Sequence, residues 1–207
     1  MTLSAAEARR IKHAPPAEGV LPVVLERWSP RSYSDRDVSA ADLRRIFEAA
    51  RWAPSSANEQ PWRYIVGLRN SPTHAKIAAA LSPGNQNWAP NAPILILGAA
   101  RSTFASSGEP NPYAFFDLGA ATLIITLEAT SLGLATHQMA GFNHDAIRQS
   151  LEIPADYLLG SVMALGHQDE PSKLTSEKHL ASETAPRTRK PLSEIAFSAW
   201  NQPLTLA

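Results

Sequence analysis

The sequence predicts a single α+β domain in which helices lie on both faces of a mixed β-sheet. Segments typical of strands alternate with segments typical of helices along its 207 residues. The 17 prolines stand mainly at the boundaries between these segments, and apolar runs lie between them, as in a folded domain. Neither a GxGxxG motif nor a P-loop motif follows any strand, so the pattern does not indicate a Rossmann or P-loop protein.

The first third of the chain predicts two helices and a strand. Val20–Arg27 is interpreted as a short helix. Ser39 and Asp42 stand three residues apart, as in a capping box, and begin an amphipathic helix that ends before Pro54. Its apolar residues recur with helical spacing at Leu43, Ile46, Phe47 and Ala50. Trp62–Leu68, rich in aromatic and β-branched residues, is expected to form a strand.

The later elements are predicted by caps and apolar runs. Ser71 as N-cap and Pro72 as first helical residue predict a helix to about Leu81. Asn143 is expected to cap a helix that ends near Leu151. Further strands are expected at Ile94–Ala99, Leu134–Met139 and Leu158–Gly166. The sequence predicts polar, irregular structure over 167–191 and a weak helix or an arm over Ser193–Trp200.

One predicted helix, Ala114–Leu132, is apolar on nearly every side. Asp117 and Glu128 are its only charges, and Gly133 is a natural C-terminal stop. The segment is long enough to span a membrane, but its two charges and the lack of flanking Lys and Arg argue against that. A helix that is apolar all round is expected to be buried, here at a subunit interface.

Composition excludes several classes of function. Lys+Arg and Asp+Glu are both 19, so no net charge attracts the chain to nucleic acid or to a membrane surface. The sequence has no cysteine, which removes disulfides and thiolate chemistry, and no histidine pair has zinc-ligand spacing, so no metal is expected. A neutral, charge-poor chain tends to associate. Residues 1–16 contain no apolar run, which predicts a cytoplasmic location.

The loop from Pro54 to Gln60 is the most informative segment. It carries Ser55, Ser56, Asn58 and Gln60 between the end of a helix and the start of a strand. These side chains offer many hydrogen-bond donors and acceptors, with Glu59 as the only charge. Such a loop suits the edge of a flat, polar heterocycle better than a phosphate or a metal. Trp62, which follows, is interpreted as core packing.

Two basic segments far apart in the sequence could bind one phosphate. Arg27-Trp28-Ser29-Pro30-Arg31-Ser32 offers two guanidinium groups and two hydroxyls, and Arg187-Thr188-Arg189-Lys190 offers three cations. Arginine forms bidentate, charge-assisted hydrogen bonds with phosphate. Taken alone, each segment is more typical of a solvated basic turn or tail than of a phosphate site.

Two further segments carry polar groups beside predicted strands. Gly84-Asn85-Gln86-Asn87-Trp88 precedes a strand, and either a ligand-facing amide or a plain loop fits it. Gly141 follows the Leu134–Met139 strand and permits a close backbone approach. His137 on that strand is interpreted as structural, since a lone histidine on a short strand rarely acts as an acid.

Taken together, these motifs resemble those of the nitroreductase-like FMN oxidoreductases. The Pro54-Ser-Ser-x-Asn-x-Gln-Pro-Trp62 pattern is similar to the loop that lies against the flavin ring in that family, and the two basic segments come in the family's order. The resemblance spans about residues 20–192, with 193–207 as a C-terminal arm of one domain, 1–207. It implies a three-layer α/β/α sandwich with a mixed, mainly antiparallel sheet and an intertwined homodimer with two interface FMN sites.

The resemblance also implies roles for individual residues. It places Arg27 and Ser29 at the FMN phosphate and ribityl oxygens, Arg31 at the flavin N1–O2 edge, and a backbone N–H near Gly141 at flavin N5. The loop would reach the ring across the dimer interface. The full set implied for the cofactor is Arg27, Trp28, Ser29, Arg31, Pro54, Ser55, Ser56, Asn58, Gln60, Met139, Ala140, Gly141, Arg187 and Arg189. Asn87, Tyr113 and Phe116 are the candidates for substrate contact, although most of the aromatic residues Phe104, Tyr113, Phe115 and Phe116 are expected in the core.

The reaction that the resemblance implies is ping-pong hydride transfer. NAD(P)H would reduce FMN at N5 and leave, and a nitroaromatic, quinone or activated alkene would then be reduced in the same place. No side-chain acid is assigned, because the flavin performs the chemistry. Three alternatives stay open: a related flavoprotein with another acceptor, a flavin-storing protein without efficient turnover, and a phosphate- or nucleotide-binding module. The neutral loop argues against the last of these.

Overall fold

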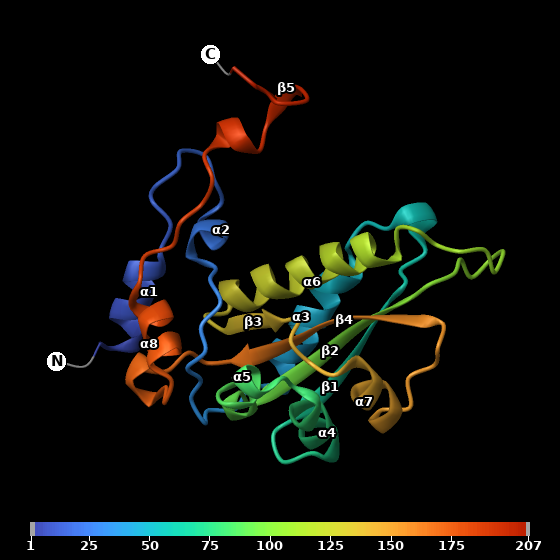
Figure 1. Cartoon of the computed structure of the whole chain (residues 1–207), viewed down its shortest axis with the longest axis horizontal. Coiled ribbons are helices and arrows are strands. Elements are labelled where there is room, and N and C mark those ends of the chain that lie inside the picture. Colours follow the sequence, from blue (N-terminus) through green and yellow to red (C-terminus); the bar gives the residue numbers. More distant parts are fainter. Residues whose placement is uncertain (1–2, 206–207) are drawn as a thin grey trace.

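The structure, a computed structural model that describes residues 3–205, is built on a four-stranded sheet (Figure 1). The strands are β1 (Trp62–Leu68), β2 (Ile94–Arg101), β3 (Ala135–Met139) and β4 (Tyr157–Gly166), in the order β1-β2-β4-β3. The predicted α+β class and mainly antiparallel sheet are confirmed. Within residues 3–205 every strand pairing is antiparallel, so a mixed sheet's parallel pair is not found there.

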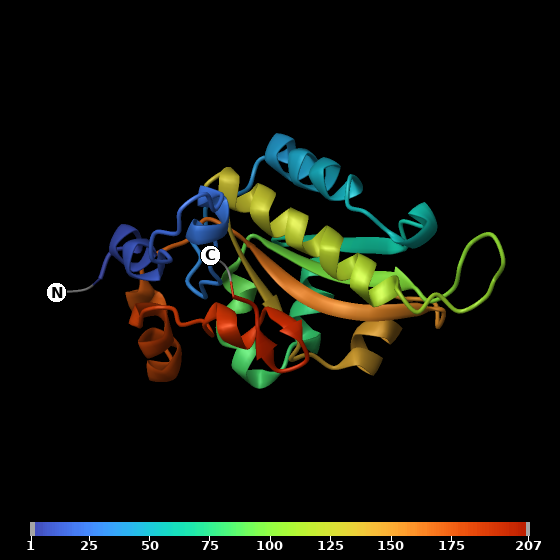
Figure 2. The same cartoon turned by 90° about the horizontal axis from the view of Figure 1, so that it is seen from above.

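Helices cover both faces of this sheet, as the alternating sequence pattern predicts (Figures 1 and 2). One face carries α3 (Ala40–Arg51) and α6 (Ala114–Ser131), and the other carries α4 (Pro72–Ala80) and α7 (His144–Ser150). Alternate residues of β2 therefore enter two cores: Ile94 and Ile96 join one, and Leu95 and Leu97 the other. Burial on both faces explains why this strand is apolar from Ile94 to Ala100.

The predicted helix caps are confirmed by hydrogen bonds. The side chains of Ser39, Ser71 and Asn143 accept from backbone N–H groups at the starts of α3, α4 and α7. At the C-terminal end of α6, Gly133 has φ 72°, and the N–H of Leu134 donates to the carbonyl of Ala129 at 2.9 Å. This Schellman ending turns the chain directly into β3.

Two helices of eight residues lie where the sequence did not predict them, and a single turn, α5 (Pro83–Gln86), lies in the segment expected as a loop. The first, α1 (Ala5–Lys12), begins with a full capping box between Ser4 and Glu7. The second, α8 (Glu177–Thr184), lies inside 167–191, so the prediction of irregular structure there was wrong. The two helices lie side by side, and Lys12 Nζ donates to the carbonyls at both ends of the last turn of α8. Each is too short to be stable alone, so mutual packing decides their formation.

The C-terminal segment leaves the body of the molecule as an arm (Figure 1). It contains a short hairpin of β5 (Phe197–Ala199) and β6 (Gln202–Pro203) in place of the alternative weak helix. Its apolar side chains are open to solvent, and Trp200 is 88% exposed. An arm of this kind has no core of its own.

Helix α6 has one buried and one exposed face. Leu118, Ile125 and Ala129 are buried against the sheet and α3, whereas Phe116 is 77% and Leu123 52% exposed. The helix is long and apolar enough to cross a membrane, but it packs as a core helix of the domain. The exposed face of α6 is apolar as well.

Candidate functional site

The two basic segments meet in space. The guanidinium of Arg187 donates two hydrogen bonds at the end of α2 (Pro22–Glu26). Its Nη1 donates to the carbonyl of Arg27 and its Nη2 to the carbonyl of Leu25. Arg27 in turn donates to Ser29 Oγ at 3.1 Å. The sequence expectation that residues near 27 and near 187 converge is therefore met, although the terminal nitrogens of Arg187 bind backbone carbonyls.

The electrostatics of this cluster favour an anion. Burial, and then the charge of Arg189, lowers the pKa of Arg27; burial, and then the charges of Arg27 and Arg189, lowers the pKa of Arg187. Among residues 3–205 no ion pair joins a carboxylate to any of these three arginines. The Nε of Arg187 is also buried, and it has no hydrogen-bond partner among residues 3–205. Mutually repelling cations without a counter-charge are typical of an anion site.

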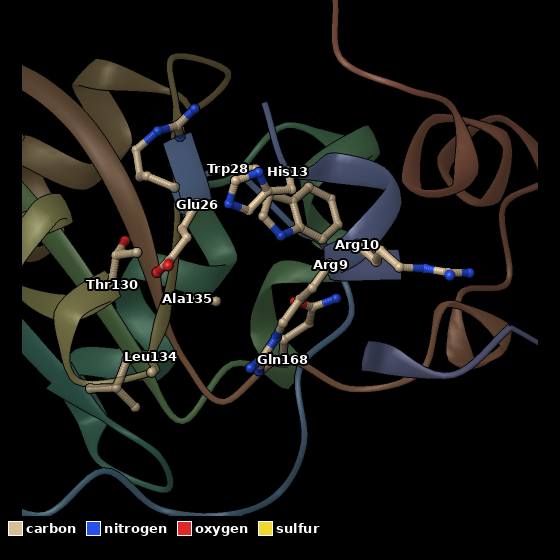
Figure 3. Close-up of a pocket in the computed structure, with 11 residues that line it drawn as sticks. Arg9, Arg10, His13, Glu26, Trp28, Thr130, Leu134, Ala135 and Gln168 are labelled. Carbon is tan, nitrogen blue, oxygen red and sulfur yellow. The ribbon is translucent and has the colours of Figure 1, made fainter. Parts of the chain in front are cut away.

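A cavity of about 300 Å³ adjoins the cluster (Figure 3). Figure 3 shows Glu26, Thr130 and Ala135 on one side, and Arg9 and Gln168 on the other. Arg9 Nε donates to Gln168 Oε1 at 2.9 Å. The cavity is lined by Arg9, Arg10, His13, Glu26, Arg27, Trp28, Thr130, Gly133, Leu134, Ala135 and Gln168. Sequence reasoning missed the residues that α1 contributes, although the Ser4–Glu7 capping box was available as a signal.

Arg31 lies between α8 and the segment 84–88. Its backbone N–H donates to Glu183 Oε1 at 2.9 Å, and its Nη1 lies 3.8 Å from the same oxygen. Nη1 also donates to Ser182 Oγ at 3.3 Å. The guanidinium carbon lies 5.9 Å from the centre of the Trp88 ring. The structure thus orients Arg31 by a carboxylate that the sequence did not indicate.

The segments around residues 85 and 141 are in contact. The N–H of Ser82 and the Nδ2 of Asn85 both donate to the carbonyl of Gly141 at 2.9 Å. A Cβ at residue 141 would lie 2.7 Å from Ser82 Oγ, so a side chain would not fit here without a shift, and the approach of this backbone to a flavin stays a prediction. Ala140 and Asn87 are exposed beside this contact, and Met139 is buried.

His137 behaves as the structural residue that the sequence predicts. Its Nδ1 lies 3.0 Å from the carbonyl oxygen of Pro30, and its ring packs 4.6 Å from that of Trp88. Burial, assisted by the charge of Arg31, lowers the pKa of His137 to about 4. A neutral imidazole in this position ties β3 to the Arg27–Arg31 segment.

The loop from Pro54 to Gln60 is held in an unusual conformation. Ala57, Asn58 and Gln60 have φ of 50°, 55° and 49°. The N–H of Ser56 donates to the buried carboxylate of Asp117 at 3.1 Å, and that of Gln60 to Ser55 Oγ at 3.0 Å. Three left-handed residues within four positions are costly, and such strain is concentrated at functional sites.

One protomer does not bring this loop to the arginine cluster. The loop is anchored by Asp117 at the start of α6, whereas the cavity beside Arg27 is lined by Thr130 near its end. Thirteen helical residues separate those two positions, which corresponds to about 20 Å. Tyr113 and Phe116, the candidates for substrate contact, lie at the loop's end of α6 and are 54% and 77% exposed. Phe115 is 51% exposed, so the expectation that most of these aromatic residues lie in the core was wrong for it.

Comparisons with known proteins agree on one family. The sequence model of the Nitroreductase family matches residues 24–87 and 68–167. A relative from Archaeoglobus fulgidus, named as a candidate NADH dehydrogenase/NAD(P)H nitroreductase, is 34% identical over 156 residues, covering 72% of this chain and 86% of its own.

Solved structures have the same fold. The crystal structure of an oxidoreductase containing FMN matches with a TM-score of 0.82 and 32% identity, over 89% of this chain and 94% of that one. A candidate nitroreductase from Desulfovibrio desulfuricans, solved in complex with FMN, matches with a TM-score of 0.69 and 25% identity, over 89% and 98% of the two chains. The residues that the family model matches include every strand of the four-stranded sheet.

Proposed function

Because this chain belongs to the Nitroreductase family, we propose that it is an FMN-dependent oxidoreductase that takes a hydride from NAD(P)H and delivers it to a small organic acceptor. Two relatives of known structure contain FMN, and the curated relative carries a nitroreductase name. The observation that carries the proposal is the cluster of Arg27, Arg187 and Arg189, three cations without a paired carboxylate among residues 3–205.

The residues present fit the chemistry of FMN. The phosphate carries about −1.5 to −2 charge at neutral pH, which suits Arg27, Ser29 and Arg189. Arg187 would contribute its charge while its hydrogen bonds hold the backbone at residue 27. We expect Arg31 at the N1–O2 edge of the ring, and the backbone of Met139, Ala140 and Gly141 beside N5. Trp28 lines the adjoining cavity.

We propose that the active form is an intertwined homodimer. Two observations support it: the exposed apolar face of α6 and the exposed apolar side chains of the arm. A partner packed on α6 would bring its own loop, with Pro54, Ser55, Ser56, Asn58 and Gln60, to this protomer's arginines. The separation of about 20 Å along α6 supports such an arrangement, because the loop and the arginines of one protomer lie at opposite ends of that helix.

The protein's own contribution is orientation and charge. Bound FMN supplies the redox chemistry, accepting a hydride from NAD(P)H and yielding it to the acceptor in two half-reactions. Arg31 would stabilise negative charge at the ring edge, and the strained loop would present preorganised amide and hydroxyl groups to the ring. The exposed Tyr113, Phe116 and Asn87 are free to contact an acceptor such as a nitroaromatic, a quinone or an activated alkene. We expect this activity in the cytoplasm, where NAD(P)H is available.

The test is the visible absorption spectrum of the purified protein before and after anaerobic NADH or NADPH. A yellow protein that bleaches with a nucleotide and recovers with a nitroaromatic or quinone supports the proposal. A yellow protein that no nucleotide bleaches indicates flavin storage or another electron donor. A colourless protein that FMN does not reconstitute contradicts the proposal, and recovery only with an aldehyde, an enone or a halogenated phenol identifies a related flavoprotein with another acceptor.

A further inference from the structure

A buried carboxylate lies behind the proposed cofactor site. Glu183, on the last turn of α8, is 0% exposed. Its Oε1 accepts from the backbone N–H of Arg31 and lies 3.8 Å from the same residue's guanidinium. Within residues 3–205 its Oε2 has no hydrogen-bond partner. A buried carboxylate with one unsatisfied oxygen is costly, so its position calls for an explanation beyond packing.

The charges around Glu183 come from three parts of the chain. On α1, Lys12 donates to the carbonyls of Ser182 and Ala185, on either side of Glu183 in the sequence. The Arg27–Tyr33 segment brings Arg31 and the buried Tyr33, whose pKa is raised by burial and then by the charge of Glu183. The other titratable groups that face Arg31 are His137 on β3 and His179 on α8. Among residues 3–205, Glu183 is the one carboxylate of this group.

We propose that Glu183 is a positioning residue that determines how much of the positive charge of Arg31 is available to the bound flavin. This inference rests on the proposed function. Ionised Glu183 pairs with Arg31 and offsets its charge, whereas protonated Glu183 still accepts the Arg31 N–H and leaves the guanidinium unpaired. The same contact therefore fixes the backbone at residue 31 in both states and changes only the charge.

The switch between the two states falls near neutral pH. Burial raises the pKa of Glu183 to about 7, against the lowering effects of the Arg31 hydrogen bond and charge and of Lys12. Below that pH, Arg31 faces the flavin as an unpaired cation. Above it, the flavin meets a neutralised pair. The reduced flavin carries the negative charge, so the effect is expected in the reduction potential more than in the binding of oxidised FMN.

The experiment compares wild type with Glu183→Gln, which mimics the protonated acid at every pH. The midpoint potential of bound FMN is measured from pH 5.5 to 8.5, together with FMN affinity by fluorescence quenching. We expect equal potentials below pH 6 and a more positive potential in the variant above pH 8. The expected gap is a threefold to tenfold preference for reduced FMN, up to about 30 mV for this two-electron couple. Comparing the two proteins at each pH removes the titration of the FMN phosphate itself.

Two further variants complete the design. Glu177→Gln removes an exposed carboxylate of the same helix and should follow wild type at every pH. Arg31→Met removes a charge that lowers the pKa of Glu183, so the buried acid should stay protonated and the midpoint potential should lose the step that wild type shows near pH 7. This measurement does not need Glu183→Gln to fold. A gap that is constant with pH, or weaker FMN binding by Glu183→Gln at every pH, overturns the inference while the proposed function stands. A wild-type protein that binds no FMN overturns both.

Discussion

The side chain of Arg187 holds the backbone of Arg27 in place. The guanidinium of Arg187 donates to the carbonyl oxygen of Arg27 across 160 positions of sequence, and its other terminal nitrogen binds the carbonyl of Leu25. Two carbonyls at the end of a helix thus receive the donors that the helix itself cannot supply. The contact fixes the backbone from which the side chain of Arg27 extends. It therefore links the C-terminal segment to the proposed phosphate site.

Replacing Arg27 with Ala should weaken FMN binding. A charge-assisted hydrogen bond to phosphate contributes roughly 1.5–3 kcal/mol, which corresponds to about a tenfold to hundredfold rise in the dissociation constant. Fluorescence titration with FMN measures this. Arg44→Ala, which removes an exposed arginine of α3, is the matched control and should bind as wild type does. Unchanged affinity in Arg27→Ala excludes its phosphate role.

Replacing Arg187 should reduce both stability and FMN binding, whereas replacing Arg189 should reduce FMN binding alone. Arg187→Ala removes the donor to the carbonyl of Arg27 and one of the two donors to that of Leu25, which also accepts from the N–H of Ala14, so it should lower the free energy of unfolding by about 1–3 kcal/mol as well as weaken FMN binding. Arg187→Lys keeps the charge but cannot span both carbonyls, so it should rescue stability only in part. Arg189→Ala should weaken FMN binding with thermal unfolding unchanged. Urea denaturation of the apoprotein separates the two effects, and equal stability of all three variants would contradict the role assigned to Arg187.

Replacing Arg31 with Ala should lower the reduction potential of bound FMN at pH 6, where protonated Glu183 leaves the charge of Arg31 unpaired. A cation near N1 and O2 stabilises the reduced, anionic flavin, and its removal favours the oxidised form. Anaerobic redox titration against a reference dye measures the shift. Arg63→Ala, at an exposed position of β1, serves as the control. If the potential of Arg31→Ala equals that of wild type, Arg31 does not face that edge.

A mixed dimer tests whether each site is shared between protomers. Asp117→Ala removes the acceptor that holds the N–H of Ser56, so the loop should lose its conformation and FMN its ring contacts. A heterodimer of one Arg27→Ala chain and one Asp117→Ala chain, isolated with two affinity tags, has one intact shared site. We expect one FMN for each such pair of chains. No FMN in the heterodimer, with full binding by wild type, indicates that each site lies within a single protomer.

The free energy of unfolding should depend on pH through two opposed groups. The pKa of Glu183 is raised from 4.5 to about 7, so its contribution is full below pH 4.5 and is lost as the pH rises through 7. The pKa of His137 is lowered from 6.5 to about 4, so its contribution is full above pH 6.5 and is lost as the pH falls through 4. Between pH 4.5 and 6.5 the two slopes, each up to about 1.4 kcal/mol per pH unit, oppose each other.

Removing the carboxylate of Glu183 should reveal the pH dependence of stability that His137 contributes. In Glu183→Gln the free energy of unfolding should rise with pH more steeply than in wild type over pH 4.5–6.5, by up to about 1.4 kcal/mol per pH unit. Urea denaturation at intervals across that range measures the slope. Glu177→Gln should run parallel to wild type. A Glu183→Gln curve that also runs parallel would show that Glu183 does not hold a raised pKa.

The sequence predicted those parts of the fold that local patterns determine. Trp62–Leu68 was placed to the residue, and the caps at Ser39, Ser71 and Asn143 marked three helix starts, because capping hydrogen bonds and apolar periodicity act over a few neighbouring residues. The sequence did not predict the helices α1 and α8, because their stability does not come from neighbouring residues alone. Each is eight residues long and has a proper N-cap, but its stability depends on the other, which is about 170 residues away.

The sequence by itself determined the residue types of the candidate site: a neutral polar loop, two basic segments and a glycine that permits close approach. The tertiary structure decided which of their groups are free. It engages Arg187 with backbone carbonyls, sets Arg31 against Glu183, and holds the loop about 20 Å along α6 from the arginines. The reason is that burial and long-range hydrogen bonds depend on which elements pack together, and no pattern of neighbouring residues encodes that packing.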